Sequence, residues 1–385
     1  MNPLYHSYAE TLDELKRQGN YRFFKQIVRQ GQQIQLSGQP MLNLSANDYL
    51  ALAQNQQLKK QFLAEYCLDA QHFTSSSSRL LTGNFAEYEQ LEQQLSQAFG
   101  RTSLLFNSGY HMNVGILPAL SDAKTLIISD ELIHASMIDG IRLSKAQKQR
   151  YAHQDLEQLE QLLLAAQDND AIDKVIVVTE SVYSMDGDIS DLRALVALKK
   201  QYSKVMLYVD EAHAIGVYGN KGLGVAEQMQ CIAEIDFLVG TFGKALASVG
   251  GYLLCDAVIR EYLINKMRSL IFSTAQAPIN MAWTSFMFTQ MQSMQAQRKN
   301  LLQISQQLKQ AVLDQGLPCP TDSHIVPIIY GENQVAVDKA QRMQEAGFYV
   351  LPIRPPTVAA GTARVRVCLH ADLKWSQLEG LVAVL

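Results

Sequence analysis

The feature that most constrains the fold is a series of short apolar runs that alternate with helical patterns between residues 103 and 255. Each run is four to six residues long and apolar on both faces, which is typical of strands covered by helices on both sides. The runs lie at residues 103–106, 125–129, 174–179, 205–209, 237–240 and 252–255, and the clearest helical patterns lie at 155–166 and 191–202. We therefore predict an α/β fold in which a mostly parallel sheet is sandwiched by helices.

The segments on either side of this series indicate two smaller parts. The first twenty residues have the pattern of an amphipathic helix that ends at Gly19, and an extended stretch follows over residues 34–44. After Pro278 a segment rich in Met and Gln continues to Gly316 with helical spacing, and a β-α-β pattern follows it. We expect three units: an N-terminal helix and extended arm over 1–45, a large α/β domain over 46–278, and a long connecting helix with a small C-terminal α+β domain over 279–385.

Composition excludes several classes of protein. Of the 385 residues, 48% are hydrophobic and 18% are charged, which is too apolar for a disordered chain. The net charge of −4 offers no electrostatic footprint for a nucleic acid or an anionic membrane. The N-terminus carries charges where a signal peptide needs an apolar core, and no apolar run approaches the roughly 18 residues of a membrane span. We expect a cytoplasmic protein without a nucleic-acid or membrane partner.

The cysteines are odd in number and scattered along the chain. They are Cys67, Cys231, Cys255, Cys319 and Cys368, with no C-x-x-C pair among them. This pattern argues against a disulfide framework or a zinc ribbon and favours a reducing compartment. We expect no metal.

Polar and titratable groups follow five of the predicted strands. They are Asn107-Ser108-Gly109-Tyr110, Ser129-Asp130 with nearby His134, residues 180–188, Asp210-Glu211-Ala212-His213 and Thr241-Phe242-Gly243-Lys244. In open α/β sheets ligands bind at the carboxyl ends of the strands. We therefore expect these groups to meet at one edge of the sheet.

Taken together, these groups predict a pyridoxal 5′-phosphate (PLP) site. Asp210 would keep the pyridine nitrogen protonated, and Lys244 would bond covalently to the cofactor and move a proton at the substrate Cα. His134 is placed to stack on the cofactor ring, and the glycine turn at Gly109 would hold the phosphate at a helix start. Taken singly, a lysine in a Gly-flanked loop is usually a surface residue, and a strand-end aspartate usually forms a turn. The combination is what indicates the cofactor.

Eight sequence motifs extend this pattern over essentially the whole chain. They are NLSANDYLAL (43–52), RLLTGNFAEYEQLE (79–92), FNSGYHMNVG (106–115), ISDELIHASMIDG (128–140), VVTESVYSMDGD (177–188), YVDEAHAIGVYGNKGLG (208–224), GTFGKALASVGGYL (240–253) and IRPPTVAAGTARVRV (353–367). In content and order they resemble the α-oxoamine synthases, a family of fold-type I PLP-dependent enzymes. The resemblance implies that fold, PLP as the cofactor, and a homodimer with shared active sites.

The resemblance also assigns roles to individual residues. It makes Lys244 the lysine bonded to the cofactor, Asp210 the partner of the pyridine nitrogen, and His134 the stacking ring. The other cofactor contacts that it implies are Ser184 and His213 to the phenolic oxygen, Gly109, Tyr110 and Thr241 to the phosphate, and Ser273 and Thr274 to the phosphate of the neighbouring subunit.

Within the family, the likeness is greatest to the branch that joins L-alanine to a pimeloyl thioester in biotin biosynthesis. The thioester is that of CoA or of an acyl-carrier protein, and the reaction releases CO2 and the free CoA or carrier. The resemblance implies that Arg22 and Arg354 bind substrate, since a guanidinium can grip the distal carboxylate of a dicarboxylic acyl chain. It also assigns Asn47, His134 and Thr357 to substrate binding.

Three alternatives remain open at the level of the sequence. The first is another family member that uses glycine or serine in place of alanine. The second is a metal-dependent hydrolase built on Asp210, Glu211 and His213, although third and fourth ligands at metal-like spacing are missing. The third is a binding protein with a decayed site, against which the intact lysine, aspartate and histidines argue.

Two positions depart from the family pattern. Where the family commonly has a Gly-Ser-Gly-Gly run, this chain has Thr74 and four serines, Ser75 to Ser78, before Arg79. Glycine there permits a positive φ or a close backbone approach, and serine adopts either only with strain. Tyr88 stands where a histidine is common, and we expect little consequence because that helix face is packed.

Overall fold

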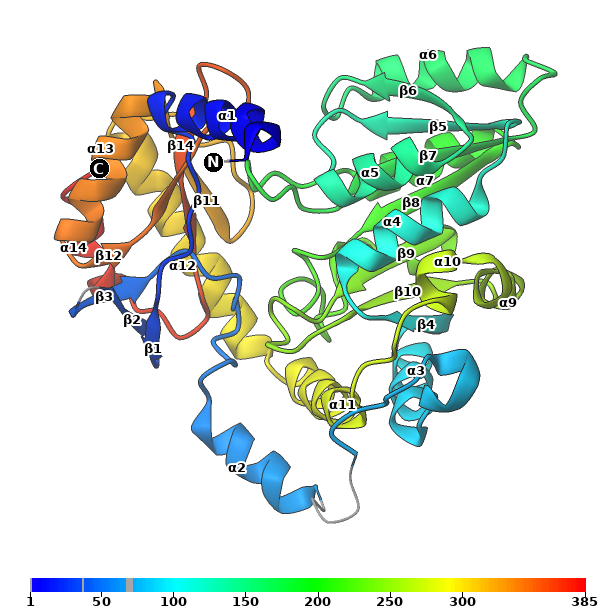
Figure 1. Cartoon of the computed structure of the whole chain (residues 1–385), viewed down its shortest axis with the longest axis horizontal. Coiled ribbons are helices and arrows are strands. Elements are labelled where there is room, and N and C mark those ends of the chain that lie inside the picture. Colours follow the sequence, from blue (N-terminus) through cyan, green and yellow to red (C-terminus); the bar gives the residue numbers. More distant parts are fainter. Residues whose placement is uncertain (1, 37, 67–71) are drawn as a thin grey trace.

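A seven-stranded sheet forms the centre of the larger part of the molecule (Figure 1). The computed structural model describes residues 2–36, 38–66 and 72–385. The strands, in spatial order, are β4 (Thr102–Phe106), β10 (Gly251–Cys255), β9 (Phe237–Thr241), β8 (Val205–Asp210), β7 (Lys174–Glu180), β5 (Thr125–Asp130) and β6 (Gln147–Tyr151). Only β10 runs antiparallel to its neighbours, and the remaining pairs are parallel. The predicted, mostly parallel α/β sheet is therefore confirmed.

Helices cover both faces of this sheet. They are α3 (Ala86–Phe99), α4 (Gly109–Leu120), α5 (Ala135–Leu143), α6 (Leu156–Gln167), α7 (Leu192–Gln201), α8 (Val225–Gln228), α9 (Ala257–Lys266), α10 (Arg268–Ile271) and α11 (Pro278–Gln292). Successive residues of β8 face opposite cores: Leu207 and Val209 join one hydrophobic cluster, and Tyr208 joins the other. This double burial explains why the strand sequences are apolar on both faces.

The two helical patterns singled out in the sequence begin at capping aspartates. Asp155 accepts a hydrogen bond from the amide of Gln158, and Asp191 accepts one from the amide of Ala194. These carboxylates satisfy backbone donors that the first turn of a helix leaves unpaired. The caps therefore fix where α6 and α7 start.

Strand β6 is the one strand of this sheet that the apolar pattern does not predict. Its sequence, Gln147–Tyr151, is polar, and four of its five residues are exposed. It pairs only with β5, so it is an edge strand and needs no apolar face on its outer side. A search for apolar runs cannot find such a strand.

Two smaller sheets form the second part of the molecule, in which both chain termini lie (Figure 1). One contains β11 (Ile325–Gly331), β14 (Ala363–Cys368) and β13 (Leu351–Ile353), and the other contains β1 (Val28–Gln30), β2 (Gln33–Leu36), β3 (Gln39–Asn43) and β12 (Phe348–Tyr349). Because β3 pairs with β12, the N-terminal arm joins the C-terminal part of the chain. The division into three units stays a prediction.

The helices of this part, and the short turns of the whole chain, complete the fold. The helices are α1 (His6–Arg17), α12 (Gln295–Asp314), α13 (Asn333–Glu345) and α14 (Glu379–Val382). Helix α2 (Gln56–Glu65) lies apart from them (Figure 1), and the ring centre of its Phe62 is 5.1 Å from that of Trp283 on α11. Single 3₁₀ turns lie at Pro3–Tyr5, Ile232–Glu234 and Trp375–Gln377, and a π turn lies at Arg79–Gly83.

The segment after Pro278 is two helices rather than one long connecting helix. Helix α11 ends at Gln292 and α12 starts at Gln295. The buried Arg298 donates hydrogen bonds to the carbonyls of Met291 at 2.7 Å and Gln292 at 3.2 Å. Carbonyls at a helix end need such partners, so the break is stabilised by a side chain and not by Pro or Gly.

The serine-rich loop adopts the strained conformation that its sequence implies. Ser76 has φ = +48°, in the left-handed region. Ser75 donates a hydrogen bond to the carbonyl of Ala275 at 2.5 Å, and the carbonyl of Ser77 accepts one from the amide of Ala275 at 2.8 Å. The loop is therefore fixed against the segment that follows α10.

Tyr88 has more consequence than we expect from the sequence. Its hydroxyl accepts a hydrogen bond from the amide of Gln276 at 2.6 Å, and the guanidinium of Arg79 lies 4.4 Å from its ring centre. Gln276 donates in turn to the carbonyl of Asn107 at 3.0 Å. Tyr88 thus supports the loop after β4 through one intermediate residue.

The described cysteines are free, and no described helix is long and apolar enough to cross a membrane. Cys231, Cys255, Cys319 and Cys368 are buried, and Cys67 lies outside the described residues.

Candidate active site

The candidate site lies where the parallel strands end. Asp210 is the last residue of β8, and Lys244 lies in the turn after β9. His134 directly precedes α5, and Gly109 is the first residue of α4. Because the carboxyl ends of parallel strands meet at one edge, these side chains are delivered to the same place.

Lys244, His213 and Tyr49 form a continuous line of hydrogen bonds, which we call the Lys244 cluster. The Nζ of Lys244 lies 2.9 Å from Nε2 of His213, and Nδ1 of His213 lies 2.6 Å from the Tyr49 hydroxyl. Tyr49 donates onward to Oδ1 of Asn47 at 3.1 Å. With that proton directed at Asn47, the tyrosine oxygen accepts from Nδ1 of His213, so Nε2 is left to accept from Lys244.

Burial keeps this cluster from carrying its full positive charge. Burial lowers the pKa of Lys244 to about 8, although the nearby Asp210 opposes this change. Burial and the proximity of Lys244 lower the pKa of His213. A lysine with such a pKa exists partly as the neutral amine near pH 7, which is the form that attacks carbonyls and takes up protons.

Asp210 is buried and held by two donors. Its Oδ2 accepts from Nδ2 of Asn113 at 2.9 Å, and its Oδ1 accepts from the amide of Ala212 at 2.8 Å. Glu180 pairs with Asp210 in the register of β7 and β8, and burial together with Asp210 raises the pKa of Glu180 well above its usual value. The raised pKa favours the protonated form of Glu180.

His134 is oriented by a network that reaches Asp210. Nδ1 of His134 accepts from the amide of Ser136 at 3.2 Å and lies 2.7 Å from the Ser136 hydroxyl. Nδ2 of Asn113 donates to the Ser136 hydroxyl at 3.0 Å and also to Oδ2 of Asp210. The carboxyl of Glu180 accepts the amide of His134 at 2.5 Å. His134 as a residue is exposed, so a group bound at this edge of the sheet could lie against it.

The start of α4 has the features of an anion cradle. The amides of Gly109 and Tyr110 stand in its first turn, where backbone N–H groups have no intrahelical partner. A Cβ added at Gly109 would make only an ordinary contact with Thr241, at 3.6 Å, whereas one added at Gly251 would lie 3.2 Å from the amide nitrogen of Gly109, so Gly251 lets β10 approach the helix start closely. The Thr241 hydroxyl donates to the carbonyl of Gly250 at 2.8 Å. These residues fit the phosphate of PLP.

Three other predicted cofactor contacts lie in loops around this edge. Ser184 is half-buried in the loop between β7 and α7. Thr274 bridges to Ser78, and its carbonyl accepts from Nδ2 of Asn107 at 2.8 Å. Ser273 and Thr274 therefore lie beside the loop that leads into α4, and their contact with a neighbouring subunit stays a prediction.

Asn47 lies beside an arginine that the sequence prediction omits. Nη2 of Arg366 donates to Oδ1 of Asn47 at 3.0 Å, and Cys368 lies 3.8 Å from the same oxygen. Alternation along β14 places Arg364, Arg366 and Cys368 on one face, and this pattern could have indicated a second cation at the site. The guanidinium of Arg366 is therefore in a position to bind the carboxylate of an amino-acid substrate.

Arg22, Arg354 and Thr357 meet at a separate cavity. It measures about 560 Å³ and is formed by α1, residues 20–22 and residues 352–357. Arg354 also donates a hydrogen bond to the carbonyl of Gly19, which ties this loop to the end of α1. The structure therefore brings the two predicted carboxylate-binding arginines together, but no member of the Lys244 cluster lines this cavity.

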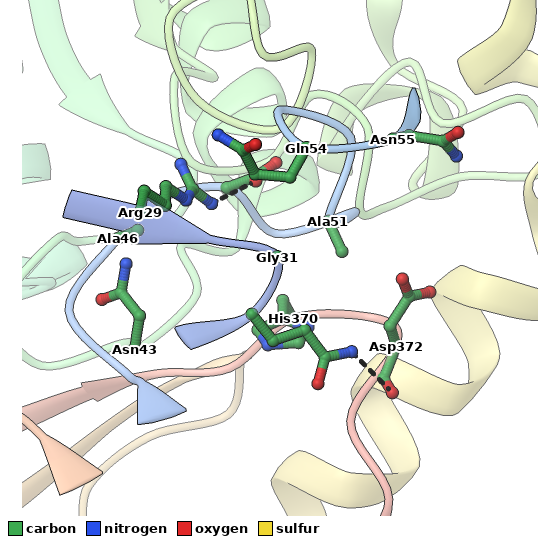
Figure 2. A pocket seen from close by; sticks show the side chains of 11 residues that line it. Arg29, Gly31, Asn43, Ala46, Ala51, Gln54, Asn55, His370 and Asp372 are labelled. Carbon is green, nitrogen blue, oxygen red and sulfur yellow. Dashed lines mark hydrogen bonds and ion pairs between the residues drawn. The ribbon is translucent and has the colours of Figure 1, made fainter. Parts of the chain in front are cut away.

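A smaller cavity of about 150 Å³ lies next to the loop that carries Asn47 and Tyr49 (Figure 2). Arg29 and Asp48 form an ion pair of 2.6 Å at its wall. His370 also lines it, and burial lowers the pKa of His370 to about 4. None of the predicted site residues lines this cavity, so it is not part of the candidate site.

Glu211 has a structural role, which argues against its use as a metal ligand in the alternative of a metal-dependent hydrolase. Its carboxylate accepts the amides of Val225 and Ala226 at 2.8 and 2.7 Å, at the start of α8. Among the residues that the structure describes, no group of three or more histidine, cysteine or acidic side chains is arranged to hold a metal ion.

Comparison with known proteins agrees with this geometry. A family model of aminotransferase class I and II matches residues 39–385, so fold and site together define a PLP-dependent transferase. A Haemophilus ducreyi protein named 8-amino-7-oxononanoate synthase is 55% identical over 386 residues, 98% of this chain and 99% of that protein. A Pasteurella multocida protein, provisionally given the same name, is 56% identical over 98% of both chains. The chain belongs to the 8-amino-7-oxononanoate synthase family.

Solved structures support the same fold and cofactor. A variant of serine palmitoyltransferase from S. paucimobilis, with bound PLP and myriocin, matches with a TM-score of 0.88 at 26% identity, over 99% of this chain and 96% of that chain. The 8-amino-7-oxononanoate synthase from Francisella tularensis matches with a TM-score of 0.74 at 26% identity, over 89% of this chain and 96% of that chain. The predicted fold type, PLP cofactor and PLP-dependent acyltransferase class are confirmed.

Proposed function

We propose that this enzyme condenses L-alanine with a pimeloyl thioester, of CoA or of an acyl-carrier protein, in biotin biosynthesis. The products are 8-amino-7-oxononanoate, CO2 and the free CoA or carrier. The observation that carries the proposal is the buried Lys244, 2.9 Å from a histidine at the edge of the sheet where Asp210 ends β8. The names of the relatives add the product, 8-amino-7-oxononanoate, and the substrate pair is the one that the sequence resemblance implies.

The residues present fit PLP at every part of the molecule. The amides of Gly109 and Tyr110 would hold its phosphate, Asp210 would hold its pyridine nitrogen, and the ring of His134, an exposed residue, would cover one face. Lys244 would hold its aldehyde carbon. When bound, PLP supplies an electron sink that stabilises negative charge at the Cα of an amino acid.

Lys244 is suited to removing the Cα proton of the amino acid. Burial gives it a pKa of about 8, so the amine can accept a proton and return it near neutral pH. His213 lies 2.9 Å away and is kept uncharged by burial and by Lys244, so it orients the amine without adding a competing positive charge. Tyr49 fixes the ring of His213 from its other nitrogen.

The amino-acid carboxylate has a natural partner in Arg366. Its guanidinium lies beside Asn47 and Tyr49, at distances of 3.0 and 3.5 Å. A hydrogen bond between this guanidinium and the substrate carboxylate would join two opposite charges, which makes it stronger than a neutral one. Asn47 would then hold the guanidinium in place as well as contact the substrate.

The acyl donor is served by the cavity that contains Arg22 and Arg354. A pimeloyl chain carries a distal carboxylate, which a guanidinium can bind. Two arginines at one 560 Å³ cavity therefore favour a dicarboxylic acyl chain. Thr357 adds a hydroxyl at the same wall.

A partner subunit is part of the proposal. Ser273 and Thr274 would reach the phosphate in a neighbouring site of a cytoplasmic homodimer. Large apolar side chains stand open to solvent in the single chain, with Phe24 fully exposed and Phe272 72% exposed. Sedimentation equilibrium of the holoenzyme tests this part, and a monomer at working concentration would contradict it.

Substrate tests separate the proposed function from its alternatives. We expect turnover with L-alanine and pimeloyl-CoA, and little with glycine or serine; a preference for either would favour another branch of the family. Arg354→Met should raise the KM for pimeloyl-CoA about tenfold, the effect of losing about 1.4 kcal/mol, and leave the KM for alanine unchanged. Arg17→Met, an exposed arginine on α1, is the matched control. Equal KM values in both variants would contradict the assignment.

A further inference from the structure

A second cluster of titratable groups lies outside the residues that the proposed reaction uses. Nδ1 of His153 lies 3.0 Å from Oδ1 of Asp130, and Nε2 of His153 lies 2.6 Å from Oδ2 of Asp188. We call these three residues the His153 cluster. A neutral imidazole has one N–H, so it can donate to only one of two carboxylates. With a carboxylate at each nitrogen, His153 must be the doubly protonated imidazolium.

Each carboxylate of the His153 cluster lies at the base of a loop that leads to the active site. Asp130 ends β5, and its Oδ1 also accepts the amide of Leu132 at 2.8 Å, two residues before His134. Asp188 closes the loop that contains Ser184, since its carbonyl accepts the amide of Tyr183 at 3.1 Å. His153 therefore links the two loops that carry His134 and Ser184.

The tip of the second loop is fixed to the C-terminal part of the molecule. Asp186 forms an ion pair of 2.5 Å with Arg364, which lies two residues before Arg366 on β14. The carbonyl of Gly187 accepts from the hydroxyl of Thr321 at 3.1 Å. Gly187 has φ = +72°, and a Cβ there would come 2.2 Å from the carbonyl oxygen of Ile325, so only glycine lets the loop tip lie this close to β11.

We propose that the imidazolium of His153 is a positioning group for catalysis. It holds the loops of His134 and Ser184 at a fixed separation and, through Asp186 and Arg364, sets the position of the strand that carries Arg366. The proposal rests on the proposed function, because His134 and Ser184 matter to the cofactor, and Arg366 to the amino acid, only if that function is right.

Among the residues that the structure describes, no cation other than His153 pairs with Asp130 or Asp188. Asp130 is fully buried at its side chain and Asp188 is 16% exposed. Glu131 accepts the backbone amide of His153 at 3.0 Å, and the rings of Tyr151 and Tyr183 are the neutral titratable groups packed around the cluster. Without the imidazolium, two carboxylates would face one another with only neutral donors, which drives the two loops apart.

The test compares His153→Gln with a rescue variant and a matched control. Glutamine fills similar space but presents a carbonyl oxygen to one of the two carboxylates. In the holoenzyme, we expect His153→Gln to raise the KM for L-alanine about tenfold and to lower kcat less, because Arg366 and His134 act on binding first. His6→Gln, at an exposed histidine 3.3 Å from one glutamate, should leave both constants unchanged.

Adding Asp188→Asn to His153→Gln should restore most of the KM. The asparagine amide donates where the carboxylate could only accept, so the repulsion disappears without any histidine. A space-filling role for His153 would not be rescued in this way. A KM within twofold of the wild type in His153→Gln, or a double variant no better than the single one, would overturn the proposal.

The wild-type enzyme offers a second measurement that needs no variant. In holoenzyme labelled with ¹⁵N-histidine, one of the eight histidines should remain doubly protonated at pH 8.5, and the absence of such a signal would overturn the proposal. Wild-type turnover of L-alanine with pimeloyl-CoA is measured first. Its failure would defeat the proposed function, whereas normal turnover with an unchanged KM in His153→Gln would defeat only this inference.

Discussion

A buried histidine, His213, and a half-buried one, His153, stand in opposite charge states, and the difference lies in their neighbours. In the Lys244 cluster, His213 faces an amine, and burial together with that amine lowers its pKa. In the His153 cluster, the ring faces two carboxylates, which overcome the effect of burial and raise its pKa to about 10. Burial alone would lower both. The first cluster is built to exchange a proton at neutral pH, and the second is built to keep one.

The largest test of this contrast removes the amine of the Lys244 cluster. Lys244→Ala should lower kcat with L-alanine and pimeloyl-CoA by at least about 1,000-fold, because both covalent attachment and proton transfer are lost. Lys221→Ala, at an exposed lysine in the loop after β8, is the control and should keep full activity. More than about a tenth of wild-type activity in Lys244→Ala would contradict the assignment of the base.

Lys244 and His213 of the Lys244 cluster were predicted from the sequence as site residues, whereas in the His153 cluster the strand-end groups Asp130 and Asp188 were noted but not the histidine that joins them. Asp210, His213 and Lys244 each follow an apolar run, and parallel strands bring their ends together whatever lies between them. Tyr49 comes from a loop 164 residues away from His213, and only the folded chain places its hydroxyl on Nδ1. Residue type and spacing carry no signal for that contact.

The His153 cluster escaped prediction for two physical reasons. His153 follows β6, a polar edge strand that has no apolar pattern. Its carboxylate partners, Asp130 and Asp188, are 23 and 35 residues distant and lie in different loops. Pairing of this kind depends on where loops end in space. The same limit applies to Arg298, whose hydrogen bonds to the end of α11 break a segment that reads as one helix.

The second test measures the pKa of Lys244 and changes it by substituting its neighbour Asp210. Covalent capture of PLP by the cofactor-free enzyme requires the neutral amine, so its rate should rise about tenfold from pH 7 to pH 9 and level off, with a midpoint at about 8. Asp210 raises the pKa of Lys244, so Asp210→Asn should shift the midpoint to lower pH. A midpoint near the ordinary lysine value in the wild type would contradict the description of this cluster.

The third test compares how pH changes stability when either kind of histidine is removed. The folded pKa of His153, about 10, lies above its unfolded value, so its contribution is complete below about pH 6.5 and is lost as the pH rises through 10. His153→Gln should therefore lower the free energy of unfolding by about 1 to 2 kcal/mol at pH 6, and by less at pH 9.5.

His324 has a lowered pKa, opposite to that of His153, and its removal should change the free energy of unfolding with the opposite pH dependence. It is fully buried, its ring centre lies 4.0 Å from that of Tyr49, and burial lowers its pKa to about 3. The wild type therefore loses stability as the pH falls below about 6.5, because the unfolded histidine binds a proton that the folded one does not. His324→Phe should be more stable than the wild type by about 1 kcal/mol at pH 5, with the gain shrinking above pH 6.5. Parallel pH profiles for His153→Gln and His324→Phe would contradict the contrast.

The smallest expected change in the free energy of unfolding is that of Ser76→Gly. This substitution involves no titrating group, so it tests backbone strain separately from charge. Ser76 has φ = +48°, a conformation that costs an L-residue about 1 to 2 kcal/mol, and glycine adopts it freely. Because glycine also loses about 0.5 to 1 kcal/mol more backbone entropy on folding, Ser76→Gly should stabilise the protein by only about 0.5 kcal/mol. Ser78→Gly, at φ = −75°, is the control and should destabilise it.

Denaturant unfolding at several pH values measures both variants, and the gain in stability of Ser76→Gly should be the same at each pH. A gain that changed with pH would show that the loop senses one of the two charged clusters, and no gain would show that its strain is relieved elsewhere.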